Sequence, residues 1–224
     1  MDTPIRKALS YFKELPADEK GNVITHFFGC LLSVIGTIWL SQHLFFESTL
    51  VLSMVFIYGF SMIFLFTAST IYHAAPAHRK AFWQRVDHIA IYFLIAGTYT
   101  PVGMTVLYET NGPRLLAIVW GLAAIGLLYK LFFINRWQGF SLFLYLGMGW
   151  LVIFEFSTIR QLFSEKALLY LVLGGFFYTF GVLFYRWHSL RFHHVIWHIF
   201  VLLGAISHFA MITEILFQTG YLDF

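Results

Sequence analysis

The sequence predicts an all-α integral membrane protein folded as a bundle of seven transmembrane helices. Two observations lead to this prediction. Hydrophobic residues make up 59% of the 224-residue chain and charged residues only 11%, whereas about a quarter of the residues in a soluble domain are charged. In addition, apolar runs of about 20 residues, the length that crosses a bilayer, follow one another along almost the whole chain with short polar connections between them.

The predicted elements begin with a polar arm of mixed charge over residues 1–21. Pro16 and Asp18 mark a turn before the first span. The arm has no apolar segment or cleavage site typical of a signal peptide. Short connections and the lack of an internal repeat predict a single domain over residues 22–224. The seven apolar runs that form it lie at 22–42, 48–73, 86–108, 113–133, 139–158, 167–186 and 194–217.

The distribution of Lys and Arg among the connections predicts the orientation, because cytoplasmic loops retain positive charge. Only Arg114, Arg160 and Lys166 lie on the side away from the N-terminus. We therefore expect the N-terminus in the cytoplasm and, after an odd number of spans, the C-terminus outside. The basic residues form no continuous patch, which argues against binding of nucleic acid. Eleven Lys and Arg residues lie on the N-terminal side of the predicted spans, against the three on the other side. They are Arg6, Lys7, Lys13, Lys20, Arg79, Lys80, Arg85, Lys130, Arg136, Arg186 and Arg191.

Four residues that can bind a metal ion fall at the same predicted membrane depth. His73 ends the second span, Asp87 begins the third after a short basic loop, and His194 and His198 begin the seventh. Ionisable groups in membrane helices are costly and commonly functional. His194 and His198 are four residues apart, so both side chains lie on one helix face and can chelate one ion. Three imidazoles suit zinc, although such residues also occur as ordinary polar helix ends.

Further polar residues accompany these four. Ser69 lies one turn before His73 on the same face and can hydrogen-bond a ligand or a zinc-bound water. His208 lies about 15 Å along the helix from His198, too far to bind the same ion, so we expect an interior hydrogen bond or a proton relay there. Three residues on one face of the first span either support the site or form an ordinary capped helix start. They are Glu19, Asn22 and His26.

Several of these residues belong to longer motifs. They are STIYH at 69–73, DHIAIYFLIAGTYTP at 87–101, HVIWH at 194–198, SHF at 207–209 and EKGNVITH at 19–26. The motifs resemble those of the hemolysin III family of bacterial membrane proteins. That family is similar to the progestin and adipoQ receptors, which include the adiponectin receptors, and more distantly to the alkaline ceramidases. The resemblance extends in matching order from residue 19 to about residue 217.

The resemblance implies a multi-pass protein of the bacterial inner membrane with zinc held by His73, His194 and His198. It places Asp87 near the zinc-bound water, and the counterpart of Ser69 lies near that centre in the ceramidases. Three protein ligands and a water form a catalytic type of zinc site, whereas four protein ligands form a structural one. As a neighbour of the water, Asp87 can accept its proton, because zinc lowers the pKa of bound water toward ~7. As a fourth ligand, Asp87 would prevent that chemistry.

Three functions remain open at this point. The first is a zinc-dependent hydrolase that cleaves the amide or ester bond of a membrane lipid. The second is a non-enzymatic protein in which zinc joins the second and seventh helices and the bundle regulates membrane state or energetics. The third is a cytolytic pore, which we rank last because a compact apolar chain without a signal peptide resembles a resident membrane protein.

Overall fold

The computed structural model describes residues 3–45, 47–133 and 138–222. All regular structure in these ranges is helical, which confirms the predicted all-α class. The elements are α1 (Pro4–Glu14), α2 (Ala17–His43), α3 (Thr49–Ala74), α4 (Ala77–Met104), α5 (Gly112–Phe133), α6 (Gln138–Trp150), the 3-10 helix η1 (Leu151–Glu155), α7 (Phe156–Leu162), α8 (Glu165–Arg186) and α9 (His193–Gln218).

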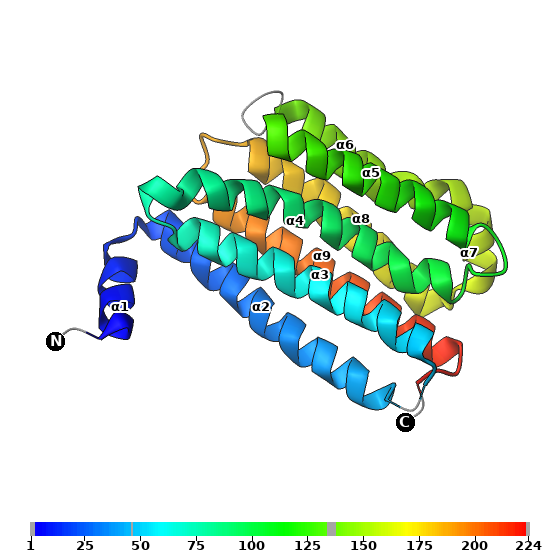
Figure 1. The fold of residues 1–224 in the computed structure, drawn as a ribbon. Coiled ribbons are helices and arrows are strands. Elements are labelled where there is room, and N and C mark those ends of the chain that lie inside the picture. Colours follow the sequence, from blue (N-terminus) through cyan, green and yellow to red (C-terminus); the bar gives the residue numbers. More distant parts are fainter. Residues whose placement is uncertain (1–2, 46, 134–137, 223–224) are drawn as a thin grey trace.

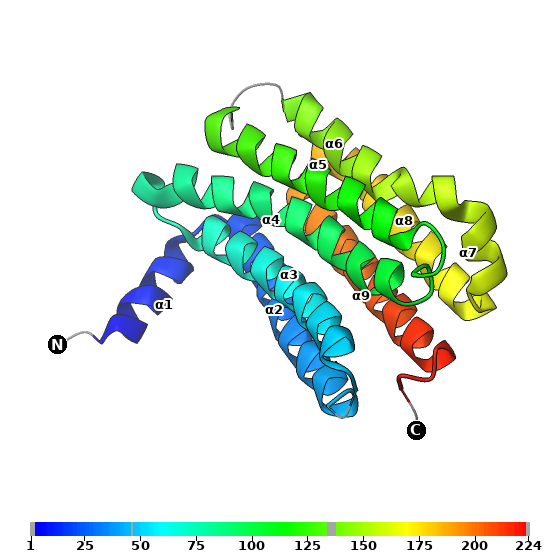
Figure 2. The same ribbon diagram turned by 45° about the vertical axis from the view of Figure 1, so that its right-hand side comes forward.

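The long helices lie side by side and form one bundle (Figure 1). Helix α9 packs against α8 and α2, α3 packs between α2 and α4, and α5 packs on the other side of α4. Helices α6 and α7 lie beside α5 and α8, while α1 projects away from one end of the bundle (Figure 2). The starts of α2, α4 and α9 and the end of α3 therefore meet at the end nearest α1.

Prolines and serines in the short connections fix where several helices begin. Pro16 and Pro76 directly precede α2 and α4. Ser48 caps α3 by accepting a hydrogen bond from the backbone N–H of Val51, and Ser164 caps α8 in the same way. These caps satisfy backbone donors that would otherwise lack partners at a helix start.

Six helical segments of the described chain are long and apolar enough to cross a membrane. They lie in α2, α3, α5, α6 to α7, α8 and α9, and they correspond to six of the seven predicted spans. Large apolar side chains cover their outer faces, among them Phe132, Phe143 and Phe154, which is 80% exposed. Exposed apolar surface of this extent indicates a lipid environment. The chain is therefore a multi-pass membrane protein.

The remaining predicted span corresponds to α4, which does not meet the same hydropathy criterion. Its sequence carries Asp87 and His88 near the middle. However, α4 packs between α3 and α5, and Ala90, Tyr92 and Ala96 have no exposed surface. Asp87 and His88 line a cavity inside the bundle, and polar residues of membrane helices usually face the interior. Low hydropathy is therefore expected of a helix that its neighbours enclose.

The predicted place of Asp87 in the first turn of its helix is wrong. Helix α4 begins at Ala77 and continues through the basic residues expected to form a loop, so Asp87 lies in its third turn. The field of a helix N-terminus fades within one turn and does not act on this carboxylate. Helix α2 likewise begins at Ala17, inside the predicted arm. Arg136, which contributed to the charge count, lies outside the described residues.

The span predicted over 139–158 is interrupted at η1. The hydroxyl of Tyr99 in α4 donates to the carbonyl oxygens of Met148 and Gly149, at 3.0 and 2.9 Å, and accepts from the backbone N–H of Val152 at 3.0 Å. A side chain inserted into the hydrogen-bond ladder is a known cause of a helix break. Tyr99 and Val152 both line the cavity inside the bundle, which we call the central cavity. The break therefore shapes this cavity.

Candidate metal centre

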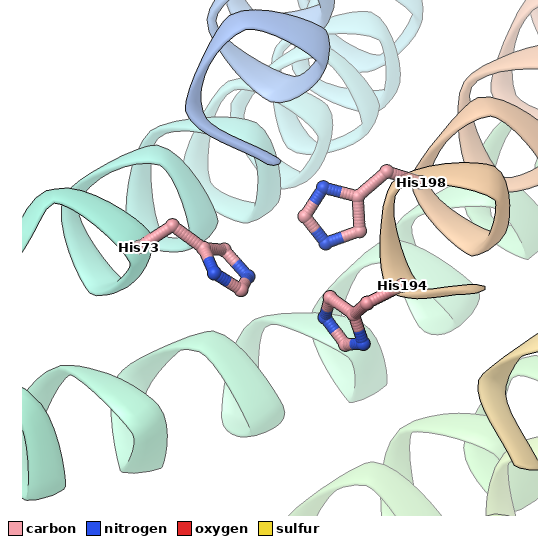
Figure 3. A group of neighbouring side chains, drawn as sticks. All are labelled: His73, His194 and His198. Atoms are coloured by element: carbon pink, nitrogen blue, oxygen red, sulfur yellow. The ribbon is translucent and has the colours of Figure 1, made fainter. Parts of the chain in front are cut away.

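Three histidines from two helices converge at the end of the bundle nearest α1. His73 lies in the last turn of α3, and His194 and His198 lie in the first turns of α9. One ring nitrogen from each lies within 4.8 Å of the other two, and the three rings face a common point (Figure 3). His73 and His198 are 3% and 2% exposed, and His194 is half-buried. These three side chains can hold a metal ion.

A carboxylate fixes the orientation of His73. Nδ1 of His73 lies 2.6 Å from Oε2 of Glu19, and Lys80 donates to the other carboxylate oxygen at 2.7 Å. An ionised carboxylate only accepts hydrogen bonds, so Nδ1 carries the proton. The lone pair of Nε2 is therefore free, and this buried atom has no hydrogen-bond partner among the described residues. A histidine held by a carboxylate and aimed through its other nitrogen is the usual arrangement of a zinc ligand.

Helix α2 orients His198 in a similar way. Nδ1 of His198 lies 3.3 Å from the carbonyl oxygen of Asn22 and 3.3 Å from the hydroxyl of Thr25. Because a carbonyl only accepts, Nδ1 donates and Nε2 remains available to a metal. The ring of His26 stacks on His198 with centroids 3.5 Å apart. Both nitrogens of the buried His26 lack hydrogen-bond partners within the described part of the chain.

The number and orientation of the ring nitrogens in the cluster suit a zinc ion. The cluster offers three imidazole nitrogens, two of them oriented by hydrogen bonds on the opposite ring atom. Three neutral imidazoles and an open fourth position form a recognised zinc-binding set. The buried, unpartnered Nε2 of His73 is costly without a ligand. The residues present therefore fit a zinc ion.

Asp87 and Ser69 lie beside the cluster. Both line the central cavity together with His194 and His198, and they are close enough to each other to interact. Ser69 is buried one turn from His73. The Asp87 carboxylate is not part of the group of three ligand atoms that lie within 4.8 Å of one another. The geometry thus separates three nitrogens from one neighbouring carboxylate.

His208 lines the same cavity but lies away from the cluster along α9. Its ring fills the space beside Gly174, where an added Cβ would overlap it. Nε2 of His208 is buried and has no partner among the residues described. The backbone of Leu171 lies within hydrogen-bonding range of the same ring, in keeping with the interior hydrogen bond expected for His208.

The cavity extends from the histidines through the apolar interior. Its volume is about 390 Å³, which is within the range of small-molecule sites. Along α9 its lining runs from His194 to Met211, a helical distance of about 25 Å. Most of the wall between these ends is apolar, including Leu94, Ile95 and Leu146. An elongated apolar molecule with one polar end fits this shape.

Thr25 and Lys80 contact the site but were not identified from the sequence. Thr25 lies three residues after Asn22 on α2, and Lys80 lies seven after His73. The sequence predicts for Lys80 only a role in membrane topology. The signal available in the sequence was the helical spacing of Thr25 from Asn22, whereas the Lys80–Glu19 pair joins residues 61 positions apart.

Replacement of Glu19 by glutamine is expected to weaken zinc binding by about 10- to 100-fold, the usual effect of losing a carboxylate behind a zinc-ligating histidine. The substitution keeps the shape of the side chain but removes the charge that polarises His73. Competition with a fluorescent chelator measures the affinity. Glu14→Gln, at an exposed carboxylate of α1, is the matched control. Equal affinities of the two variants would contradict the role given to Glu19.

The amino-acid sequence is similar to those of known proteins of one family. Residues 16–209 match the model of a family described as haemolysin-III related. The chain is 40% identical over 195 residues to a hemolysin-3 homolog of Bacillus subtilis (strain 168), covering 86% of this chain and 91% of that protein. It is 39% identical to hemolysin-3 of Bacillus cereus, covering 86% and 89%.

A human protein, the monocyte to macrophage differentiation factor, is 27% identical over 219 residues, covering 93% of this chain and 88% of that protein. The match to the family model spans all three histidines of the cluster, Asp87 and Glu19. The predicted resemblance is thereby confirmed, and the chain belongs to the haemolysin III-related family of membrane proteins.

Proposed function

We propose that this protein is a zinc-dependent membrane hydrolase that cleaves the amide or ester bond of a lipid. One observation carries the proposal. The three-histidine cluster and a separate carboxylate, Asp87, stand together at the polar end of a long apolar cavity. A purely structural metal site needs neither the cavity nor the neighbouring carboxylate.

Each residue has a definite task in this proposal. Zinc, when bound by His73, His194 and His198, supplies a Lewis acid that activates water and polarises a carbonyl. Asp87 accepts the proton of the attacking water and delivers it to the leaving group. Ser69 orients Asp87 through the contact between the two side chains. The apolar cavity walls hold the lipid chain and exclude water from it.

The test uses purified protein in lipid nanodiscs. We expect about one zinc per chain, and release of fatty acid from lipid amides or esters that stops when zinc is chelated and returns when zinc is restored. Protein purified without chelators that contains no metal would overturn the site. Protein with full zinc content and no turnover on amides or esters would overturn the hydrolase and favour zinc as a fastener between α3 and α9.

We also propose that α4 is the seventh span and that the metal centre lies at the cytoplasmic side of the bacterial inner membrane. The length of α4 and its position among the other spans support this topology. Reporter fusions at the two termini provide the test. We expect cytoplasmic reporter activity at the N-terminus and periplasmic activity at the C-terminus. Activity on the same side for both would contradict seven spans.

A further inference from the structure

A second polar group lies on the cavity wall, next to the metal centre but separate from it. Lys130 is in the last turn of α5 and is only 1% exposed, although the charge count had assigned it to a loop. It lines the cavity together with His88 of α4 and Ser141 of α6. These three side chains, from three different helices, are called the α4–α5–α6 polar cluster below.

The polar cluster has unused hydrogen-bonding capacity. No hydrogen bond or ion pair joins Lys130 to another residue in the described ranges, where the ion pairs found are those of Glu19 with His73 and Lys80. Nδ1 of His88 is buried and has no partner there, and the buried hydroxyl of Ser141 makes no short hydrogen bond, although Tyr92 lies close enough to interact with it. A buried, unpaired ammonium is costly. An ammonium without a partner, beside a hydroxyl and an imidazole nitrogen on the same part of the cavity wall, indicates a ligand that accepts hydrogen bonds.

Close packing of α4 against α5 determines the position of the α4–α5–α6 polar cluster. An added Cβ at Gly126 would overlap the ring of Tyr92, so α4 and α5 approach each other closely at that level. Lys130 follows Gly126 by one turn of α5, and His88 precedes Tyr92 by one turn of the antiparallel α4. The hydroxyl of Tyr145 in α6 donates to the carbonyl oxygen of His88 at 2.8 Å. The three helices thus hold the cluster in place.

The charges facing the cluster favour an anion. Asp87 is the single carboxylate among the described residues of the cavity wall, and it lies within electrostatic range of Lys130. No ion pair within 4.0 Å joins the two side chains, so Asp87 does not occupy the hydrogen bonds of the ammonium. A metal ion at the nearby histidines would make the region positively charged overall.

We propose that the α4–α5–α6 polar cluster binds the anionic head group, a phosphate or a carboxylate, of a single-chain lipid whose tail lies in the apolar cavity. Ile91 and Ile95 follow His88 along the wall, and Leu142 and Leu146 follow Ser141. They offer the tail an apolar path that begins at Lys130. The inference rests on the proposed function in assigning the cavity to a lipid, and it adds that the lipid is acidic.

The test compares ligands that share a tail and differ in the head. Binding of dodecylphosphonate, dodecanol and dodecyltrimethylammonium to the protein in zwitterionic nanodiscs is measured by calorimetry. The wild type is expected to bind the phosphonate about 10- to 100-fold more tightly than the alcohol, as for a hydrogen bond to a charged group. Lys130→Met should remove this preference, and Lys130→Arg should retain it. Lys166→Met, at an exposed lysine of α8, should change nothing.

Two further arms separate the sources of binding. Chelator-treated protein should keep the preference for phosphonate, and Lys130→Met should still remove it. A preference that disappears with zinc and does not depend on Lys130 would show that the anion binds the metal, and would overturn the proposal. Methylphosphonate should bind weakly; binding as tight as that of dodecylphosphonate would mean a site for a soluble anion. Because binding is measured, the absence of hydrolysis leaves the test intact.

Discussion

Replacement of His194 by alanine is expected to lower bound zinc from about one ion per chain to nearly none, because two histidines do not make a stable zinc site. His194 is the best ligand to remove, since it is half-buried, whereas removal of His73 would also remove a hydrogen bond of the Glu19 carboxylate. Metal analysis of protein purified without chelators measures the loss. Hydrolysis of lipid should fall in proportion.

His193→Ala is the matched control for this variant. His193 is the adjacent residue, but its Nδ1 lies 3.1 Å from the carbonyl oxygen of Phe184 and its ring packs against His188. Its ring also lies edge-on to that of His194, with centroids 6.0 Å apart, but His193 does not belong to the group of three metal-binding histidines. Zinc content should be unchanged in His193→Ala. Full zinc content in His194→Ala would mean that the metal lies elsewhere, and equal losses in both variants would point to damage at the start of α9.

The three metal-binding candidates could be predicted because helix ends determine depth. His73 ends one apolar run and His194 begins another, and the alternating direction of successive helices brings both to the same end of the bundle. The i, i+4 spacing of His194 and His198 then places both on one face. These properties depend on local sequence and on the period of the helix, so they survive errors of several residues in the boundaries.

The partners of these residues were harder to predict. Glu19 was identified by its helix face, but its contact with His73 depends on how α2 packs against α3, which the sequence does not specify. Lys80 and Lys130 were both counted as loop charges. Basic residues at the end of an apolar run signal topology in most cases, and only the packing of α5 against α4 and α6 shows that Lys130 is buried.

Asp87→Asn should reduce turnover by about 10²- to 10⁴-fold, the usual contribution of a general base, while zinc content stays at the wild-type level. Asparagine has nearly the same shape and can keep a hydrogen bond with Ser69, but its amide cannot accept a proton from water. Fatty-acid release and metal content are measured on the same samples. Glu155→Gln, at a carboxylate that accepts from Asn111 near the other end of the bundle, should leave both unchanged.

The two measurements together distinguish the roles that the sequence left open for Asp87. A carboxylate that only contacts the water affects turnover alone, whereas a fourth ligand affects zinc affinity as well. The ligand cluster contains three nitrogens without this carboxylate, and Asp87 lies in the third turn of α4, where no helix terminus stabilises its charge. We therefore expect zinc to be retained. Loss of zinc in Asp87→Asn, equal to that in His194→Ala, would instead identify a closed four-ligand site and remove the basis for hydrolysis.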